Sequence, residues 1–285
     1  DVCSSDLGLY IGLMSGTSLD GIDALLADFS AAHPRVVAHH HDSLPATLRA
    51  ELAALNEPGT DELRRAALAG NELANCYARC VASVIGQSGC AVADVMAIGC
   101  HGQTVRHQPA AGYTIQLVNA ALLAELTHLT VVSDFRSRDV AAGGEGAPLV
   151  PAFHAAVFGT PDEHRVVVNI GGIANLTDLP PAGPVTGFDC GPGNLLLDGW
   201  VQKHLGTSFD RDGDWARSGR IISTLFGRLA ADEYFRLRPP KSTGRETFNM
   251  QWVAGHLNGS ENPVDVQATL LELTARGIAD AILKF

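Results

Sequence analysis

Residues 7–29 read Leu-Gly-Leu-Tyr-Ile-Gly-Leu-Met-Ser-Gly-Thr-Ser-Leu-Asp-Gly-Ile-Asp-Ala-Leu-Leu-Ala-Asp-Phe, and the architecture of the chain can be built from them. Leu7 to Met14 is apolar and β-prone, a polar turn runs from Gly16 to Gly21, and Ile22 to Phe29 is apolar again. This pattern predicts a β-hairpin with glycines in its turn. Residues 165–179, Arg-Val-Val-Val-Asn-Ile-Gly-Gly-Ile-Ala-Asn-Leu-Thr-Asp-Leu, repeat the plan more weakly. Two domains that each open with a glycine hairpin predict a duplicated α/β architecture with a cleft between the halves.

Between and beyond the hairpins, strand patterns alternate with helical ones, which is typical of an α/β sheet covered by helices. The further predicted strands are residues 35–39, 95–99, 113–117 and 130–133, and the predicted helices are residues 61–86, 120–127 and 268–283. Glycines and prolines in Gly143-Gly-Glu-Gly-Ala-Pro-Leu-Val-Pro151 indicate a domain junction. We therefore expect a first domain over residues 8–150 and a second over residues 151–285.

The two ends of the sequence differ from the rest. Residues 1–7 show neither a strand nor a helix period, and we interpret them as a non-native remnant. The helical pattern of residues 268–283 runs to Phe285 without a cap or a turn, so we expect the second domain to be incomplete at its C-terminus.

Composition narrows the class of protein. The 285 residues include 20 Lys and Arg against 31 Asp and Glu, a net charge of −11 that disfavours a nucleic acid partner. No apolar run approaches the roughly 18 residues of a membrane span, and no signal peptide is evident, so we expect a cytoplasmic protein with no membrane partner. The six cysteines show no C-x-x-C spacing. Cys76 and Cys80 would share a helix face, but we interpret them as buried thiols rather than as half of a metal site.

The first hairpin turn has the composition of a phosphate-binding segment. Small residues between Gly16 and Asp23 let backbone N–H groups approach a polyphosphate, and the hydroxyls of Thr17 and Ser18 add donors. Asp20 or Asp23 could hold a hydrated Mg²⁺ ion. An ordinary hairpin whose glycines only supply positive φ explains the same segment equally well.

Asn169-Ile-Gly-Gly-Ile-Ala-Asn175 is a second candidate phosphate segment. Alone it fits a plain β-turn better. Two such hairpins in one chain favour phosphate binding, because a nucleotide between two domains needs a contact from each.

Gly187-Phe-Asp-Cys-Gly-Pro-Gly-Asn194 holds a candidate general base. Asp189 stands between a strand and a Gly-Pro-Gly loop, which would fix its carboxylate in one geometry. The alternative is that Asp189 caps the helix predicted to begin near Asn194.

Two further stretches offer polar groups. In Ser133-Asp-Phe-Arg-Ser-Arg-Asp139 two arginines could bind an anionic group, although surface pairing with aspartate is the commoner use. His101, Gln103 and Thr104 follow a predicted strand end and offer neutral donors for sugar hydroxyls, while a buried structural histidine is the alternative for His101. We expect His39-His-His41 to form a solvated turn.

Seven stretches, in chain order, match one known family. They are Leu13–Asp23, His101–His107, Asp134–Pro151, Asn169–Asn175, Gly187–Asn194, Phe209–Gly213 and Lys241–Glu246. Together they resemble the anhydro-N-acetylmuramic acid kinase family of the actin, hexokinase and Hsp70-like ATPase superfamily. The resemblance implies an α/β fold of two ribonuclease-H-like domains that bind ATP, with Mg²⁺, and 1,6-anhydro-N-acetylmuramic acid between them.

The resemblance also implies a reaction and the residues that carry it. Water adds at the anomeric carbon and opens the 1,6-anhydro bridge, and the freed O6 takes the γ-phosphoryl group, giving N-acetylmuramate 6-phosphate and ADP in peptidoglycan recycling. Asp189 maps to the catalytic base and Arg138 to the sugar and phosphate site. The implied ATP-binding residues are Gly16, Thr17, Ser18, Leu19, Asp20, Gly21, Ile22, Asp23, Asn169, Gly171 and Gly172. The implied sugar-binding residues are His101, Gln103, Thr104, Arg138 and Asn194.

Other functions fit parts of the same pattern. A phosphohydrolase of the same superfamily would split a phosphoanhydride with water in the same site. A noncatalytic sensor or an actin-like assembly protein would use nucleotide without a sugar. A homodimer is one option for the oligomeric state.

Overall fold

The computed structural model describes residues 8–17, 19–31, 33–245 and 247–284. The predicted remnant at residues 1–7 and the candidate ligand Ser18 lie outside the described residues. The chain divides into two compact units, one up to Gly146 and the other from Ala147, so the predicted junction at residue 150 falls inside the second unit. Among the residues described, no helix combines the length and the apolar character that crossing a membrane requires.

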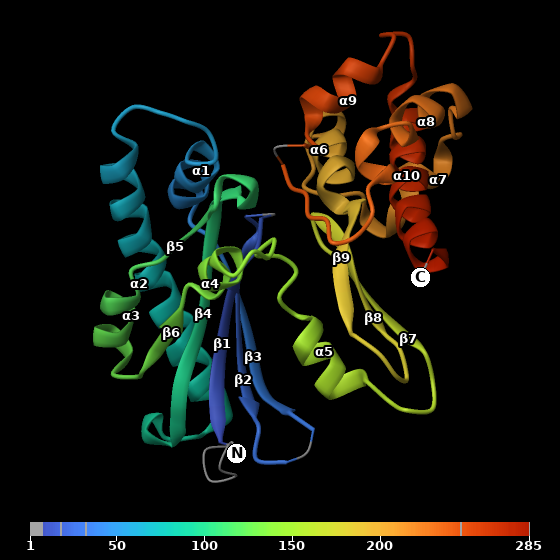
Figure 1. The fold of residues 1–285 in the computed structure, drawn as a ribbon. Helices are drawn as coiled ribbons and strands as arrows, with labels where there is room; N and C mark the ends of the chain where they lie inside the picture. Colours follow the sequence, from blue (N-terminus) through green and yellow to red (C-terminus); the bar gives the residue numbers. More distant parts are fainter. Residues whose placement is uncertain (1–7, 18, 32, 246, 285) are drawn as a thin grey trace. The chain divides into compact units, whose positions relative to one another are not determined.

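The first unit is built on a six-stranded mixed sheet (Figure 1). Its strands are β1 (Leu9–Ser15), β2 (Gly21–Asp28), β3 (Arg35–Ser43), β4 (Val95–Gln108), β5 (Tyr113–Leu117) and β6 (Val131–Ser133). The order is β3-β2-β1-β4-β5, and β6 pairs with β4 in parallel. The strands β1 and β2 form the predicted antiparallel hairpin, with Ser15 opposite Ile22.

Helices cover this sheet because the strands alternate buried and exposed residues. Ile11 and Leu13 on β1 are buried while Gly12 and Met14 are exposed, as the period of two requires. The helices of the unit are α1 (Ala46–Ala54), α2 (Glu62–Ser88), α3 (Ala120–Thr127) and α4 (Phe135–Ala141). Helix α2 packs on β2 and β3, and its buried residues join the core beneath them.

Two expectations for the first unit are wrong. The strand that was expected to end at Gly99 continues as β4 to Gln108, so His101, Gln103 and Thr104 lie within a strand and not in a turn. Gly102 makes this possible: its φ is 74°, and a Cβ there would lie 2.7 Å from the carbonyl oxygen of Leu117. The predicted turn at residues 39–41 is likewise part of the longer strand β3.

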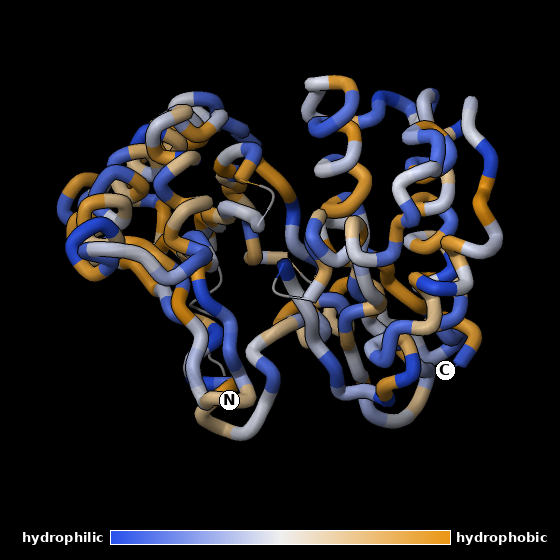
Figure 2. The backbone as a smooth tube through the Cα atoms, turned by 90° about the horizontal axis from the view of Figure 1, so that it is seen from above, coloured by the Kyte–Doolittle hydropathy of each residue, from blue (hydrophilic) through white to orange (hydrophobic). Residues whose placement is uncertain are grey.

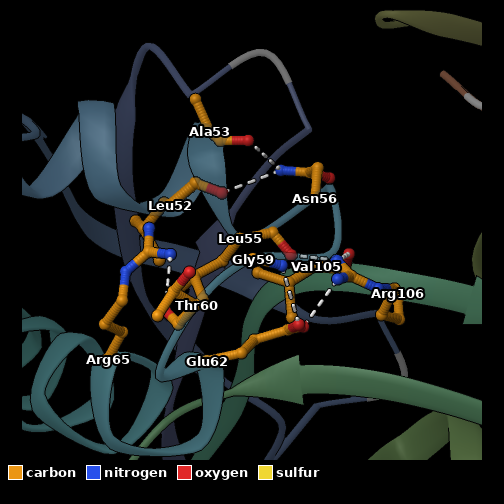
Figure 3. Close-up of polar contacts among 10 residues, drawn as sticks. All are labelled: Leu52, Ala53, Leu55, Asn56, Gly59, Thr60, Glu62, Arg65, Val105 and Arg106. Atoms are coloured by element: carbon orange, nitrogen blue, oxygen red, sulfur yellow. Dashed lines mark hydrogen bonds and ion pairs between the residues drawn. The ribbon is translucent and has the colours of Figure 1, made fainter.

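The strand β4 also holds the segment between α1 and α2 (Figure 3). Arg106 donates from Nη1 to the backbone oxygen of Leu55 and from Nη2 to Oε1 of Glu62 over 2.6 Å. Arg65 donates to Glu51 of α1, also over 2.6 Å. These charged contacts tie both helices to the sheet where the backbone is irregular.

The second unit has a three-stranded antiparallel sheet in the order β7-β8-β9. Its strands are β7 (Arg165–Ile170), β8 (Ile173–Leu179) and β9 (Thr186–Pro192). Its helices are α5 (Pro151–Phe158), α6 (Asn194–Leu205), α7 (Asp214–Ser218), α8 (Ser223–Ala230), α9 (Met250–His256) and α10 (Pro263–Leu283). Helix α10 packs on β8 and β9 and against α6, α7 and α8. In Figure 2 short hydrophobic and hydrophilic stretches alternate along the backbone of both units, which is typical of elements with one buried face.

Candidate active site

Asp189 lies on β9 with 5% of its surface exposed, and its carboxylate is fixed by a segment far along the chain. Its Oδ2 accepts hydrogen bonds from the hydroxyl of Ser242 over 3.0 Å and from the backbone N–H of Thr243 over 2.9 Å. The backbone N–H of Asp189 in turn donates to the oxygen of Lys241 over 3.1 Å. The two donors to Oδ2 and the backbone bond of the same residue hold the carboxylate in one orientation, which a general base requires.

The capping alternative for Asp189 does not describe the start of α6. Gly193 is the N-cap residue, and no side chain caps it. The carbonyl oxygen of Gly171 accepts from the N–H of Asn194 over 2.8 Å, and that of Gly172 accepts from Gly193 and Leu195. The first N–H groups of the helix therefore bind the β7–β8 turn.

These bonds join two of the sequence motifs into one local structure. The predicted second phosphate turn, Gly171-Gly172, lies directly against the loop that carries Gly193 and Asn194. A Cβ on Gly193 would lie 2.3 Å from the oxygen of Gly171, so only glycine allows this approach. Asn194 also donates from Nδ2 to the oxygen of Ile170 over 3.4 Å.

Two polar atoms near Asp189 are buried without a hydrogen-bond partner. Asn175 on β8 pairs in register with Asp189, and its Oδ1 has no partner. The hydroxyl of Thr243, whose N–H binds Asp189, has none either. Buried polar atoms of native proteins almost always bind protein, water or a ligand, so this pair indicates a place for substrate or water beside Asp189. Asn169 is exposed at the end of the same hairpin, opposite Asn175.

In the first unit the β1–β2 turn is held by its backbone and by Gln103. The N–H of Leu19 donates to the oxygen of Gly16 over 3.2 Å, and Leu19 has a φ of 58° with its side chain buried. Left-handed backbone at a non-glycine residue costs free energy, on the order of 1 kcal/mol, and persists where packing enforces it. The N–H of Gly21 donates to Oδ1 of Asp20 over 2.9 Å, and Ile22 is buried in the core below.

Gln103 is 1% exposed and binds this turn from β4. Its Oε1 accepts from the hydroxyl of Ser15, and its Nε2 donates to the oxygen of Gly16 over 3.1 Å. The structure therefore gives Gln103 a role in fixing the turn. Thr104, its neighbour, accepts from Nε2 of Gln116 on β5 over 3.3 Å.

His101 is paired with an arginine that the resemblance had not assigned. Nε of Arg136 donates to Nε2 of His101 over 3.0 Å, and Nδ1 of the ring lies 2.7 Å from the oxygen of Gly102. This requires a neutral ring with its proton on Nδ1. Burial, and then the charge of Arg136, lowers the pKa of His101 to about 4. The same arginine donates from Nη1 to the oxygen of Gly146 over 2.6 Å.

The glycine loop after α4 wraps around Asp139. Its Oδ2 accepts from the N–H of Gly146 over 2.7 Å, and a Cβ on Gly144 would lie 2.3 Å from the same oxygen. Arg138 is exposed on α4, so its sugar or phosphate contact stays a prediction.

The two candidate Mg²⁺ ligands have different surroundings. Oδ1 of Asp23 lies 3.0 Å from Nε2 of His39 and 3.1 Å from Nδ1 of His41. Two imidazoles beside the carboxylate do not suit Mg²⁺, which prefers oxygen ligands and keeps several waters. Asp20 is exposed in the turn beside the backbone N–H of Gly21, a setting that fits a hydrated Mg²⁺ ion better.

Sequence reasoning missed the residues that hold the base. Ser242 and Thr243 lie in Lys241–Glu246, which carried the family resemblance but received no role. No local signal links them to Asp189, because the contact is made across 53 and 54 positions.

The comparisons with known proteins agree with one another. A model of the family described as anhydro-N-acetylmuramic acid kinase matches residues 8–285. The protein of that name from Nitrosospira multiformis is 58% identical over 278 residues, 97% of this chain and 76% of the relative. The one from Nitrosomonas europaea is 54% identical over 275 residues, 96% of this chain and 76% of the relative. Thus the chain spans about three quarters of the length of these relatives.

A more distant match comes from a solved structure. Component A of the (R)-2-hydroxyglutaryl-CoA dehydratase of Acidaminococcus fermentans aligns over 97% of this chain and 76% of that chain. The TM-score is 0.42 and the identity 12%, a level of likeness that bears on neither fold nor function.

Proposed function

The chain belongs to the anhydro-N-acetylmuramic acid kinase family, and from this premise we propose which of its residues carry the reaction. The protein is a sugar kinase that uses ATP to phosphorylate 1,6-anhydro-N-acetylmuramic acid. The observation that carries the proposal is the buried carboxylate of Asp189, held by Ser242 and Thr243 beside two polar atoms without partners.

Asp189 is the proposed general base. Its carboxylate takes a proton from a water molecule, whose oxygen forms a bond to the anomeric carbon while the bond from that carbon to O6 breaks. The freed O6 forms a bond to the γ-phosphorus, the bond to the bridging oxygen breaks, and ADP leaves. The hydroxyl of Ser242 and the N–H of Thr243 hold the carboxylate so that its proton-accepting direction is constant.

The two glycine hairpins are the proposed phosphate contacts. In the first unit these are the turn residues Gly16 to Gly21, and in the second they are Gly171 and Gly172 with the flanking Asn169. Backbone N–H groups in turns with left-handed residues form concave anion sites, and Leu19 has this conformation. Asp20 is the proposed Mg²⁺ ligand, because its carboxylate is exposed in the turn whereas Asp23 lies beside two imidazoles. When bound, Mg²⁺ would offset charge on the transferring phosphoryl group.

The remaining candidate residues are the proposed contacts of the sugar. We assign Thr104, Asn194 and Arg138 to the sugar, and His101 acts through Arg136, whose side chain it orients. We also propose that the two units are ribonuclease-H-like domains, that the protein works in the cytoplasm, and that it forms a homodimer.

Product analysis tests the assignment. The full-length enzyme is incubated with ATP, H₂¹⁸O and the anhydro sugar, and the products are examined by mass spectrometry. A sugar 6-phosphate with the heavy oxygen at C1 supports the proposed roles of water and base. Heavy oxygen in inorganic phosphate, released with or without the sugar, would instead indicate the phosphohydrolase alternative.

A further inference from the structure

Three side chains outside the kinase site meet where the edge strand β3 packs on α2. His40 and Asp42 lie two positions apart on β3 and so on one face of the sheet, and Cys80 reaches them from α2. An imidazole nitrogen, a carboxylate oxygen and the thiol sulfur all lie within 4.8 Å of one another. We propose that His40, Asp42 and Cys80 bind a Zn²⁺ ion.

The distances suit the coordination shell of this metal. Zinc bonds of 2.0–2.3 Å in a tetrahedral arrangement place ligand atoms about 3.5 Å apart. Since no two of the three atoms are more than 4.8 Å apart, no pair needs to approach by more than about 1.3 Å. Cys80 is fully buried and fixed in the core, whereas Asp42 is exposed and His40 is half-buried, so the two strand residues can make the adjustment. The one hydrogen bond described for the His40 ring, to Nε2 of Gln87, is long at 3.4 Å.

The chemistry of the donors selects the metal. A thiolate and an imidazole are ligands of zinc and similar transition metals, whereas Mg²⁺ and Ca²⁺ prefer sets of oxygens. Three protein ligands leave the fourth position to a water molecule on the side of the exposed Asp42.

The second thiol of the helix has another partner. Cys76 lies one turn before Cys80, and its sulfur accepts a hydrogen bond from Nη2 of Arg79 over 3.2 Å. Of the two cysteines, only Cys80 is therefore a ligand of the proposed zinc site. The other two ligands come from β3. The nearer of them, Asp42, is 38 positions from Cys80, too far for a sequence motif to indicate the site.

Binding would join an edge strand to a helix. The metal replaces the thiol proton of Cys80, which is released to solvent, and no electron transfer is involved. Burial, and then the negative charge of Asp42, raises the pKa of this thiol to about 11, so the metal-free thiol keeps its proton at neutral pH. The bound ion stabilises the folded first unit, because the unfolded chain does not hold these ligands together.

The opposite face of β3 provides a matched control. His39 and His41 point away from α2 and contact Asp23, so they share the strand and the residue type with His40 but not its neighbours. A binding site on α2 must therefore depend on His40 and not on His39.

Spectroscopy with Co²⁺ as a substitute for Zn²⁺ tests the proposal. The metal-free full chain is titrated with Co²⁺ and then with competing Zn²⁺. We expect a thiolate-to-cobalt charge-transfer band and the strong visible bands of tetrahedral Co²⁺, both removed by one equivalent of Zn²⁺. Removing a residue that only hydrogen-bonds to a metal ligand commonly costs about 10–100-fold in metal affinity. Loss of a ligand itself in His40→Asn or Asp42→Asn should therefore cost at least roughly 100-fold, and Cys80→Ser should abolish the thiolate band. His39→Asn and Cys76→Ser should bind as the wild type does.

Several outcomes would overturn the assignment. These are a wild-type titration without the thiolate band, a band that survives Cys80→Ser, or equal losses in His39→Asn and His40→Asn. If Cys80→Ser does not fold, the strand variants decide, because His40 and Asp42 are outside the closely packed core. As a second readout, Zn²⁺ should raise the unfolding midpoint of the wild type and leave that of His40→Asn unchanged.

Discussion

The backbone N–H of Thr243 donates to Oδ2 of Asp189 over 2.9 Å, although 54 positions separate the two residues. The adjacent hydroxyl of Ser242 donates to the same oxygen. One carboxylate oxygen therefore has a structural role, and the plane of the carboxyl group is set before any substrate binds.

Asp189→Asn should keep this geometry and lose the base. The amide oxygen of asparagine can accept from Ser242 and Thr243 as the carboxylate does, so folding and sugar binding should be preserved. General bases contribute roughly 10²–10⁴-fold, and single-turnover phosphorylation should slow by that factor. Asp212→Asn, exposed in the short 3₁₀ helix Arg211–Gly213, is the control. Near-normal turnover by Asp189→Asn would remove Asp189 from the role of base.

Ser242→Ala should lower kcat with little change in KM. It removes one of the donors described for the carboxylate, and a hydrogen bond to a charged group contributes about 1.5–3 kcal/mol, which corresponds to a loss of at least tenfold in rate. Ser242→Thr keeps a hydroxyl and should restore most of the activity. If both variants raise KM and leave kcat intact, Ser242 contacts substrate and does not position the base.

Gly193→Ala should separate the β7–β8 turn from the start of α6. The new Cβ would lie 2.3 Å from the oxygen of Gly171, and overpacking of this kind costs about 1–3 kcal/mol of stability. We expect a lower unfolding free energy and a higher KM for ATP, measured by denaturant titration and steady-state kinetics. Gly227→Ala in α8 is the matched control, because nothing lies within 4 Å of its added Cβ. Equal behaviour of the two variants would contradict the close approach.

The pKa of His101 should make the first unit less stable in acid. The folded pKa is about 4, below the unfolded value near 6.5, so the unfolded chain binds a proton that the folded chain does not. Above pH 6.5 the ring is neutral in both states and the free energy of unfolding is not affected. As the pH falls from 6.5 towards 4, protonation of the unfolded chain lowers the free energy of unfolding by up to about 3 kcal/mol. Unfolding free energies from circular dichroism at pH 7 and pH 4.5 should show a smaller loss for His101→Gln than for the wild type. The exposed control His33→Gln should show the wild-type loss.

Local patterns predicted the elements whose residues alternate regularly. The β1–β2 hairpin follows from buried Ile11 and Leu13 and from a turn rich in small residues, and α2 follows from its apolar helical period. The strand β4 was predicted too short because glycine usually ends regular structure, whereas Gly102 here lies in a register shift between β4 and β1, and pairing with β1 resumes at Gln103. Helix α4 was missed because its arginines were read for their charge alone.

The candidate site could be predicted only where one stretch carries it. The local setting of Asp189 was visible in Gly187–Asn194, but its partners Ser242 and Thr243 come from a different part of the chain. Arg136 and Arg138 have the same residue type two positions apart, and only the helix geometry decides which one reaches His101. Long-range contacts of this kind depend on tertiary packing and leave no periodic trace in sequence.

The length of β4 has a mechanical consequence. One continuous strand carries His101, which holds Arg136, Gln103, which holds the turn at Gly16, and Arg106, which holds the chain at Leu55. The helix segment at Leu55, the glycine turn and Arg136 are therefore held by side chains of the same strand. A displacement of β4 would act on all three places at once.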